Sequence, residues 1–179
     1  MAILLAEVLV ILALIGANGL FAMTEIAVVS ARKSRLRSLA EAGDARALGA
    51  LELAGSPNRF LSTVQIGITL MGVIAGAFGG ATLAEDIAGQ LVHVPWFGRY
   101  AEGMAFAIVV FGISYLSLVL GELVPKRLAL IAPERIAMAS AGPMRRLSVL
   151  AKPAVAVLSA STDADRKSTR LNSSHESPS

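Results

Sequence analysis

Three long apolar runs alternate with polar, charge-rich stretches along the chain. The runs cover about residues 4–29, 60–84 and 103–121, and the second and third contain no charged residue. Each is long enough to cross the roughly 30 Å hydrocarbon core of a bilayer, which takes about 20 helical residues. The pattern predicts an all-α membrane protein with three transmembrane helices plus juxtamembrane or interfacial helices. The second run would form a helix about 37 Å long, so we expect it to tilt or to end in a break.

The stretch between the first two runs predicts a helix at the membrane surface. Residues 33–53 begin within a basic cluster and are rich in Ala, Leu, Arg and Glu, a composition typical of an amphipathic surface helix. The segment Gly55-Ser56-Pro57-Asn58 should end this helix, with Ser56 or Asn58 capping the next one. Residues 85–102 are predicted to form a loop at the membrane interface.

We expect two regions before the tail: a membrane domain over residues 1–130 and juxtamembrane helices over residues 131–162. Pro133 is expected to begin a helix. Residues 136–150 are short and basic for a membrane span, which favours interfacial or cytoplasmic helices. A fourth span that continues through Val157 stays open as the alternative.

The basic residues are distributed unevenly between the runs. Six lie between the first and second runs, one lies between the second and third, and six more follow the third before the tail. Because loops rich in Lys and Arg stay on the cytoplasmic side, the N-terminus is predicted outside and the C-terminus inside. The protein is then a multi-pass protein of the cell membrane, either the inner or the plasma membrane.

Composition narrows the function classes. Charged residues make up only 16% of the chain and hydrophobic residues 55%, whereas a soluble domain has about a quarter charged. The lipid bilayer is therefore the partner that the composition requires. No stretch interleaves basic with aromatic residues, which argues against a nucleic-acid partner. The chain has no cysteine and no nucleophile–base set, so we assign no catalytic residues and expect no enzyme activity.

The end of the third run carries the most informative polar group, Glu122, within Gly121-Glu122-Leu123-Val124-Pro125-Lys126. In a continuing helix the N–H of residue 125 would bond the Gly121 carbonyl, but proline has no N–H. A free carbonyl beside a carboxylate offers the oxygen ligands that hard cations prefer. We therefore predict a metal site that includes Gly121 and Glu122. The alternative is that Glu122 pairs with Lys126 or Arg127 and is structural.

Other polar residues lie at the same predicted depth. Glu25 shares a helix face with Asn18, and Ser62, Gln65 and Thr69 recur on one face of the second run. Polar groups facing lipid are costly, about 2.5–3.5 kcal/mol for a charge at mid-span, so these side chains should face protein or water. Their common depth predicts one shared site.

Two of these features have structural alternatives. Glu25 could pair with Arg32 or Lys33 near the end of its span. Gly72, Gly76 and Gly80 extend the polar face of the second run, and such spacing is typical of a close helix–helix contact.

The last residues differ in character from the rest. Residues 165–175 resemble an in-frame translation of a common short-read sequencing adapter, so residues 163–179 are treated as a disordered tail outside the fold. We expect the natural protein to continue beyond about Ala164.

Three passages together resemble the membrane domain of the CNNM/CorC family of magnesium transporters, which includes the hemolysin-C-like bacterial proteins. They begin at Asn18-Gly19-Leu20-Phe21, at Asn58-Arg59-Phe60-Leu61 and at Gly121-Glu122, and the resemblance covers roughly residues 5–160. It implies three spans with a juxtamembrane belt, a homodimer, and cytosolic CBS domains that bind adenine nucleotide.

The resemblance also implies a Mg²⁺ site. By position it would use Thr24, the neighbourhood of Thr69, and Gly121 with Glu122. Transport-competent relatives tend to have asparagines where this chain has Ile68 and Gly72, so Gln65 or Ser62 would have to supply oxygens. The implied function is export of a divalent cation, magnesium, with coupling to sodium as a further expectation. The alternative is a non-transporting dimeric membrane anchor that regulates CBS sensor domains.

Overall fold

A computed structural model describes residues 2–93 and 98–150, and these residues form helices and no strand. Three helical segments are long and apolar enough to cross a membrane, as predicted. The first two are α1, Ala2–Ser30, and α4, Pro57–Leu91. The third begins with the 3₁₀ turn η1, Gly98–Tyr100, and α5, Ala101–Leu118. It continues through the π-helical turn η2, Val119–Leu123, into α6, Val124–Ile131.

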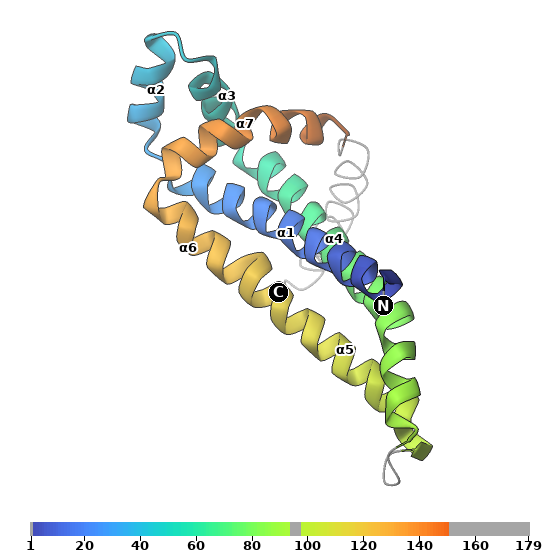
Figure 1. Cartoon of the computed structure of the whole chain (residues 1–179). Helices are drawn as coiled ribbons and strands as arrows, with labels where there is room; N and C mark the ends of the chain where they lie inside the picture. The colour runs from blue at the N-terminus through green and yellow to red at the C-terminus, as the bar shows by residue number, and fades with distance from the viewer. Residues whose placement is uncertain (1, 94–97, 151–179) are drawn as a thin grey trace, which may run out of the picture.

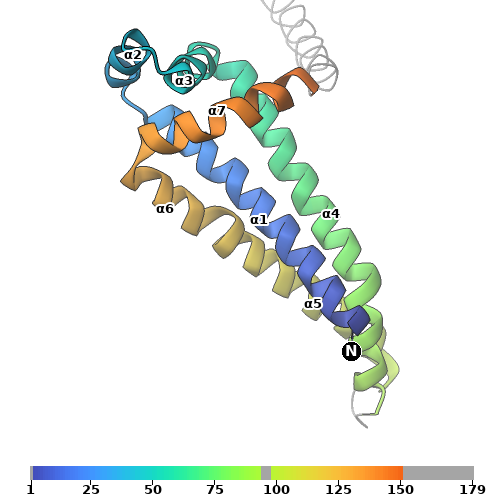
Figure 2. The ribbon, with the colours of Figure 1, turned by 45° about the horizontal axis from the view of Figure 1, so that its top comes forward.

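The three segments run side by side, with α1 between α4 and the η2–α6 segment (Figures 1 and 2). At the end where α1 begins, α4 packs directly against α5. Toward the other end α1 contacts α4 on one side and α6 with η2 on the other. The first helix thus acts as the central packing element of the spans.

The remaining helices collect at the end of the bundle opposite the N-terminus (Figure 1). They are α2, Lys33–Glu41, α3, Ala45–Gly55, and α7, Pro133–Leu150, and we call them the belt. Buried alanines such as Ala50 and Ala141 allow α3 and α7 to pack closely, and Leu36 of α2 is fully buried. The belt therefore has a core of its own and is not three separate surface helices.

The predicted single helix over residues 33–53 is wrong, because the structure divides it into α2 and α3. Gly43 lies between them with φ of +94°, a conformation that favours glycine. Asp44 then caps α3 by accepting a hydrogen bond from the Arg46 N–H at 2.9 Å. The left-handed glycine and the cap together turn the chain.

The ends of α4 also differ from the prediction. Ser56 precedes the helix without a side-chain capping bond, and Pro57 is the first helical residue. The helix continues without interruption to Leu91, so residues 85–91, predicted as part of the loop over residues 85–102, are helical. Its 35 residues correspond to about 52 Å, well beyond the roughly 30 Å hydrocarbon core. Pro133 begins α7 as predicted, and the alternative of a span through Val157 lies outside the described residues.

Two apolar clusters are separated along α1 by a polar stretch. One cluster, at the N-terminal end of α1, includes Ile11, Ile15 and Ile113. The other joins the end of α1 to the belt and includes Phe60 and Leu36. Asn18 and Thr24, both buried, lie on the part of α1 between the two clusters. The first helix therefore carries buried polar residues between the two apolar clusters.

Of the three glycines predicted to form a helix–helix seam, Gly80 contacts another of the described helices, whereas Gly72 and Gly76 do not. A Cβ at Gly72 or Gly76 would meet no atom within 4 Å. The glycines that receive neighbouring helices are Gly67, against the Phe21 ring, and Gly79 and Gly80, against Ile113 and Phe106. The face of α4 that carries Gly72 and Gly76 is open in the single chain.

Glu134 ties the belt to the end of α1. Its carboxylate accepts a hydrogen bond from the Arg32 N–H at 3.4 Å and lies 3.7 Å from the Arg32 Nε. Its own backbone N–H, then the Arg32 N–H and the charges of Arg35 and Arg32, hold the pKa of Glu134 below its usual value, against the opposing effect of burial.

We expect Glu134→Gln to lower the melting temperature by a few degrees at neutral pH. Because the folded-state pKa lies below 4.5, the ionised carboxylate stabilises the fold above that pH, and this contribution is lost as the pH falls through the folded pKa. The difference between wild type and variant should therefore shrink in acid. The melting temperatures of wild type and variant are measured in detergent at several pH values. Glu41→Gln, at the exposed end of α2, is the control. A difference that persists unchanged in acid would contradict this account.

Candidate cation site

The π-helical turn η2 follows from Pro125. Since proline has no N–H, the helix cannot continue its regular hydrogen bonds to residue 121. The chain widens by one residue instead, and the N–H of Val124 bonds the carbonyl of Val119, five residues back. Both Gly121 and Pro125 are buried against α1. The widened turn thus places an irregular piece of backbone inside the bundle and not toward lipid.

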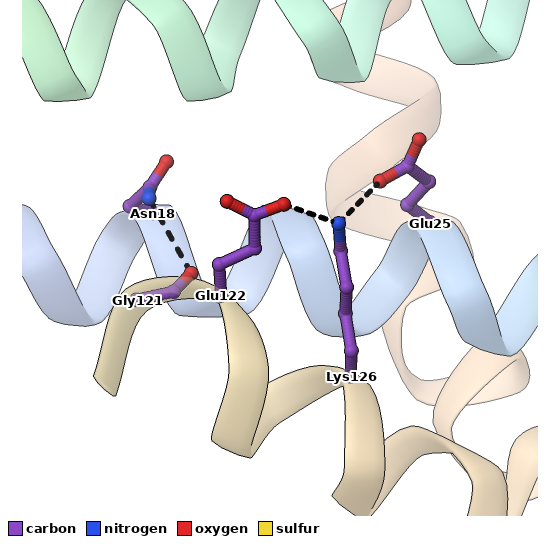
Figure 3. A network of polar contacts seen from close by, with 5 residues as sticks. All are labelled: Asn18, Glu25, Gly121, Glu122 and Lys126. Atoms are coloured by element: carbon purple, nitrogen blue, oxygen red, sulfur yellow. Dashed lines mark hydrogen bonds and ion pairs between the residues drawn. The ribbon is translucent and has the colours of Figure 1, made fainter. Parts of the chain in front are cut away.

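The Gly121 carbonyl is bound by a protein side chain. Asn18 of α1 donates from Nδ2 to this oxygen at 3.3 Å (Figure 3). Two glycines allow the approach: a Cβ on Gly121 would lie 3.0 Å from Asn18 Nδ2, and a Cβ on Gly19 would lie 3.0 Å from the Pro125 ring. The sequence assigned this carbonyl to a metal ion, whereas in the structure it accepts a hydrogen bond from a side-chain amide.

Lys126 places an ammonium group between two carboxylates from different helices. Its Nζ donates to Glu122 Oε1 at 2.5 Å and lies 3.9 Å from Glu25 Oε2 (Figure 3). All three side chains are partly exposed, Glu122 at 37%, Lys126 at 30% and Glu25 at 21%. Glu25 therefore pairs with Lys126 and not with Arg32 or Lys33 as the structural alternative had it. We call Glu25, Glu122 and Lys126 the charged triad.

The other predicted ligands do not join the triad. Thr24 is buried, but its hydroxyl donates to the Leu20 carbonyl of its own helix at 2.7 Å. Ser62, Gln65 and Thr69 are exposed on α4, and Gln65 and Thr69 line a shallow apolar groove with Leu70 and Val73. The buried hydroxyl on that part of α4 is Thr63, which donates to the Arg59 carbonyl.

The geometry therefore brings together three of the seven predicted ligands: Glu25, Gly121 and Glu122. It adds Asn18, whose Oδ1 is buried without a hydrogen-bond partner among the described residues, and Lys126. In the same residues no group of three or more His, Asp or Glu side chains lies close enough to hold a metal ion. The sequence placed Asn18 on the same helix face as Glu25, but it did not predict that Asn18 would bind the Gly121 carbonyl.

The charged triad carries one more negative than positive charge at neutral pH. Its carboxylates come from η2 and α1, and the ammonium comes from α6 one turn beyond Glu122. In a low dielectric such an arrangement is stable only while each carboxylate has a cationic partner. One ammonium group therefore faces two carboxylates, and the net negative charge favours a cation over an anion at this position.

These features define a multi-pass membrane protein with a charged site at a broken third span. The family model "Cyclin M transmembrane N-terminal domain" matches residues 9–178. The chain belongs to this family, the CNNM transmembrane domains, as the three sequence passages indicated.

Similar proteins occur in several bacteria. A UPF0053 protein of Synechocystis is 48% identical over 96% of this chain and 38% of its own length. A protein named polyamine export protein in Haemophilus influenzae is 33% identical over 83% of this chain and 34% of its own length. Its namesake in Escherichia coli is 30% identical over 85% of this chain. The chain thus spans between a third and two fifths of the length of these relatives.

Gly121→Ala should destabilise the bundle by about 1–3 kcal/mol, the usual cost of overpacking. The added methyl would press on Asn18 Nδ2 and, at 3.3 Å, on the Ile15 carbonyl, and it would weaken the Asn18–Gly121 hydrogen bond. Gly112→Ala, in α5, is the matched control because its Cβ would meet nothing within 4 Å. Unfolding in detergent with a chemical denaturant compares the two. Equal stability of both variants would show that the close approach of η2 to α1 is not needed.

Proposed function

We propose that this chain is the membrane-embedded part of a cation exporter whose cargo binds Glu25 and Glu122. The observation that carries the proposal is the Lys126 ammonium between these two carboxylates, which come from different spans. Carboxylates within a membrane are costly unless they are paired, and they commonly mark a cation pathway. A site that already holds a positively charged group is electrostatically ready for a cargo of the same charge.

In this mechanism the cargo takes the place of Lys126. The lysine serves as an internal counter-ion while the site is empty of cargo, so the carboxylates never remain unpaired. An arriving cation binds Glu122 and Glu25, and the flexible lysine side chain withdraws toward the belt end. On departure of the cargo the lysine returns, which resets the site.

An organic cation with several ammonium groups is the cargo that the geometry supports best. An alkylammonium reproduces the charge and the three N–H donors that Lys126 presents to the carboxylates. Two of the similar proteins are named polyamine export proteins. Polyamine export is therefore the first candidate.

Magnesium export, with coupling to sodium, is the second candidate, and the family resemblance favours it. Mg²⁺ usually keeps several waters and binds through one or two carboxylates, so Glu25 and Glu122 would suffice for a hydrated ion. Gly121 and Thr24 could contribute only after giving up their present hydrogen bonds. A large rotation of α4, or a site shared with a second copy of the chain, would be needed for Ser62, Gln65 and Thr69 to bind the same ion.

The proposed orientation places the belt end in the cytoplasm, where export would begin. The belt end carries the basic residues, so we infer that it faces the cytoplasm, with the N-terminus outside. Gating by nucleotide-binding CBS domains, which the resemblance implies, belongs to the same proposal. The alternative is a non-transporting dimeric anchor in which the charged triad is structural.

Vesicles that contain the chain test the transport proposal. Uptake of radiolabelled spermidine, and separately of Mg²⁺ with an internal indicator dye, is measured for wild type, Glu122→Gln and Glu25→Gln. We expect at least a tenfold loss of flux in both variants, because removing one charged hydrogen bond costs about 1.5 kcal/mol or more. The control is Glu52→Gln, an exposed carboxylate of the belt. Flux of spermidine alone or of Mg²⁺ alone identifies the cargo. Absence of both fluxes in wild type would favour the anchor.

We also infer a homodimer that forms through the open face of α4. Gln65 and Thr69 are exposed there, and Gly72 and Gly76 leave room for a neighbouring helix. Polar side chains and glycines are the residues by which helices associate in lipid. A second copy would shield these polar groups from hydrocarbon.

Since the chain has no cysteine, single-cysteine variants test this contact cleanly. Gly76→Cys should give a disulfide-linked dimer on mild oxidation in membranes. Phe111→Cys should not, because Phe111 lies on α5, where it is 75% exposed. The measurement is the fraction of dimer on a non-reducing gel. Equal cross-linking of both variants would mean that collisions, and not a specific interface, produce the dimer.

A further inference from the structure

A basic cavity of about 220 Å³ lies in the belt, away from the charged triad. It is formed where the end of α3, the start of α4 and the end of α7 meet, and the transport proposal assigns it no role. Its lining is partly apolar, from Leu53, Phe60 and Val149, and partly polar. The polar lining residues are Glu52, Ser56, Arg59, Arg145 and Ser148.

Two arginines from different helices line this cavity. Arg59 comes from the first turn of α4 and Arg145 from α7. Glu52 also lines it and lies 3.5 Å from Arg145, so one carboxylate offsets part of the charge. The lining keeps a net positive charge, and each arginine has a planar fork of donors suited to phosphate oxygens.

Hydrogen-bond donors without partners complete the site. The Ser148 hydroxyl is buried and has no partner among the described residues. Ser56, at the start of α4, makes no capping bond, and the first turn of this 35-residue helix carries no acidic residue. The positive end of the helix dipole therefore adds to the two arginines. Guanidinium groups, a free hydroxyl and an uncapped helix start are all groups that bind an anion.

We propose that this cavity binds a phosphate group, and that its usual source is the headgroup of an anionic phospholipid. The volume is below the roughly 300–1,000 Å³ of pockets that enclose a whole cofactor, so it fits a headgroup better than a nucleotide. The apolar lining beside the polar part, with Val149 55% exposed, gives an acyl chain a surface to follow. Basic pockets between membrane helices on the cytoplasmic side bind such headgroups. This inference uses the orientation proposed above but not the transport activity.

The test uses the chain in nanodiscs of phosphatidylcholine, with and without phosphatidylglycerol. We expect phosphatidylglycerol to raise the melting temperature of wild type and to remain bound in native mass spectrometry after transfer to detergent. Arg59→Gln and Arg145→Gln should each weaken its binding about tenfold, as expected for loss of one charged hydrogen bond. Arg146→Gln is the matched control, since Arg146 is exposed on α7 and does not line the cavity. Inorganic phosphate and ATP, added to pure phosphatidylcholine nanodiscs, form the second arm.

Ser148→Leu separates a shaped site from general attraction to basic residues. The larger side chain would fill the cavity without changing any charge, so it should abolish binding while the arginines remain. Stabilisation by inorganic phosphate or ATP but not by phosphatidylglycerol would support the phosphate site and identify a soluble source. Equal losses in Arg146→Gln and Arg145→Gln, unchanged binding in Ser148→Leu, or no binding by any probe would overturn the proposal. Circular dichroism of each variant confirms that it is folded.

Discussion

The contact between α1 and the π-helical turn is the constraint on which the rest of this structure depends. Pro125 removes one N–H from the third span, and the Gly121 carbonyl must then find a donor inside a membrane, where an unsatisfied carbonyl is costly. Asn18 supplies it, and it can do so only because Gly19 and Gly121 let the two backbones approach. The break in the third span and the central position of α1 are thus two parts of one arrangement.

The charged triad follows from that contact. Once α1 and η2 are held together, Glu25 and Glu122 lie on the same side of the bundle, and two carboxylates so placed repel each other unless a cation intervenes. Lys126, one turn beyond Glu122, is in a position to provide it. Ion pairs of this kind contribute little net stability because desolvation offsets attraction. In the proposed mechanism this balance lets a cargo cation displace the lysine, because the cation replaces only a weakly favourable partner.

The sequence predicted the three spans, whereas it did not say which of the polar side chains would lie together, for a physical reason. Charge-free runs mark membrane helices because each polar group in lipid is costly, and Pro125 identified the broken span because its missing N–H is a local property. Which neighbour a side chain faces depends on how the whole helices pack, and not on the local sequence. Ser62, Gln65 and Thr69 share a face, but the pattern does not say whether that face meets α1 or lies open, and in the single chain it lies open. The turn at Gly43 was missed although Gly43 followed by Asp44, the N-cap of α3, is a local signal for one helix ending and another beginning.

The short helix α6 connects the charged triad with the belt. It has eight residues, carries Lys126 near its start and buries Ala129 in the apolar cluster that includes Leu36 and Met144 of the belt. A helix this short moves as one piece, so withdrawal of Lys126 by a displacement of α6 would have to shift Ala129 against α1 and α7. Withdrawal by rotation of the flexible lysine side chain alone has no such cost. Because close-packed cores resist continuous deformation, the proposed exchange is easier by rotation of the lysine side chain than by displacement of α6. A displacement of α6 would couple the proposed site to the belt, because Ala129 packs in the cluster that includes belt residues.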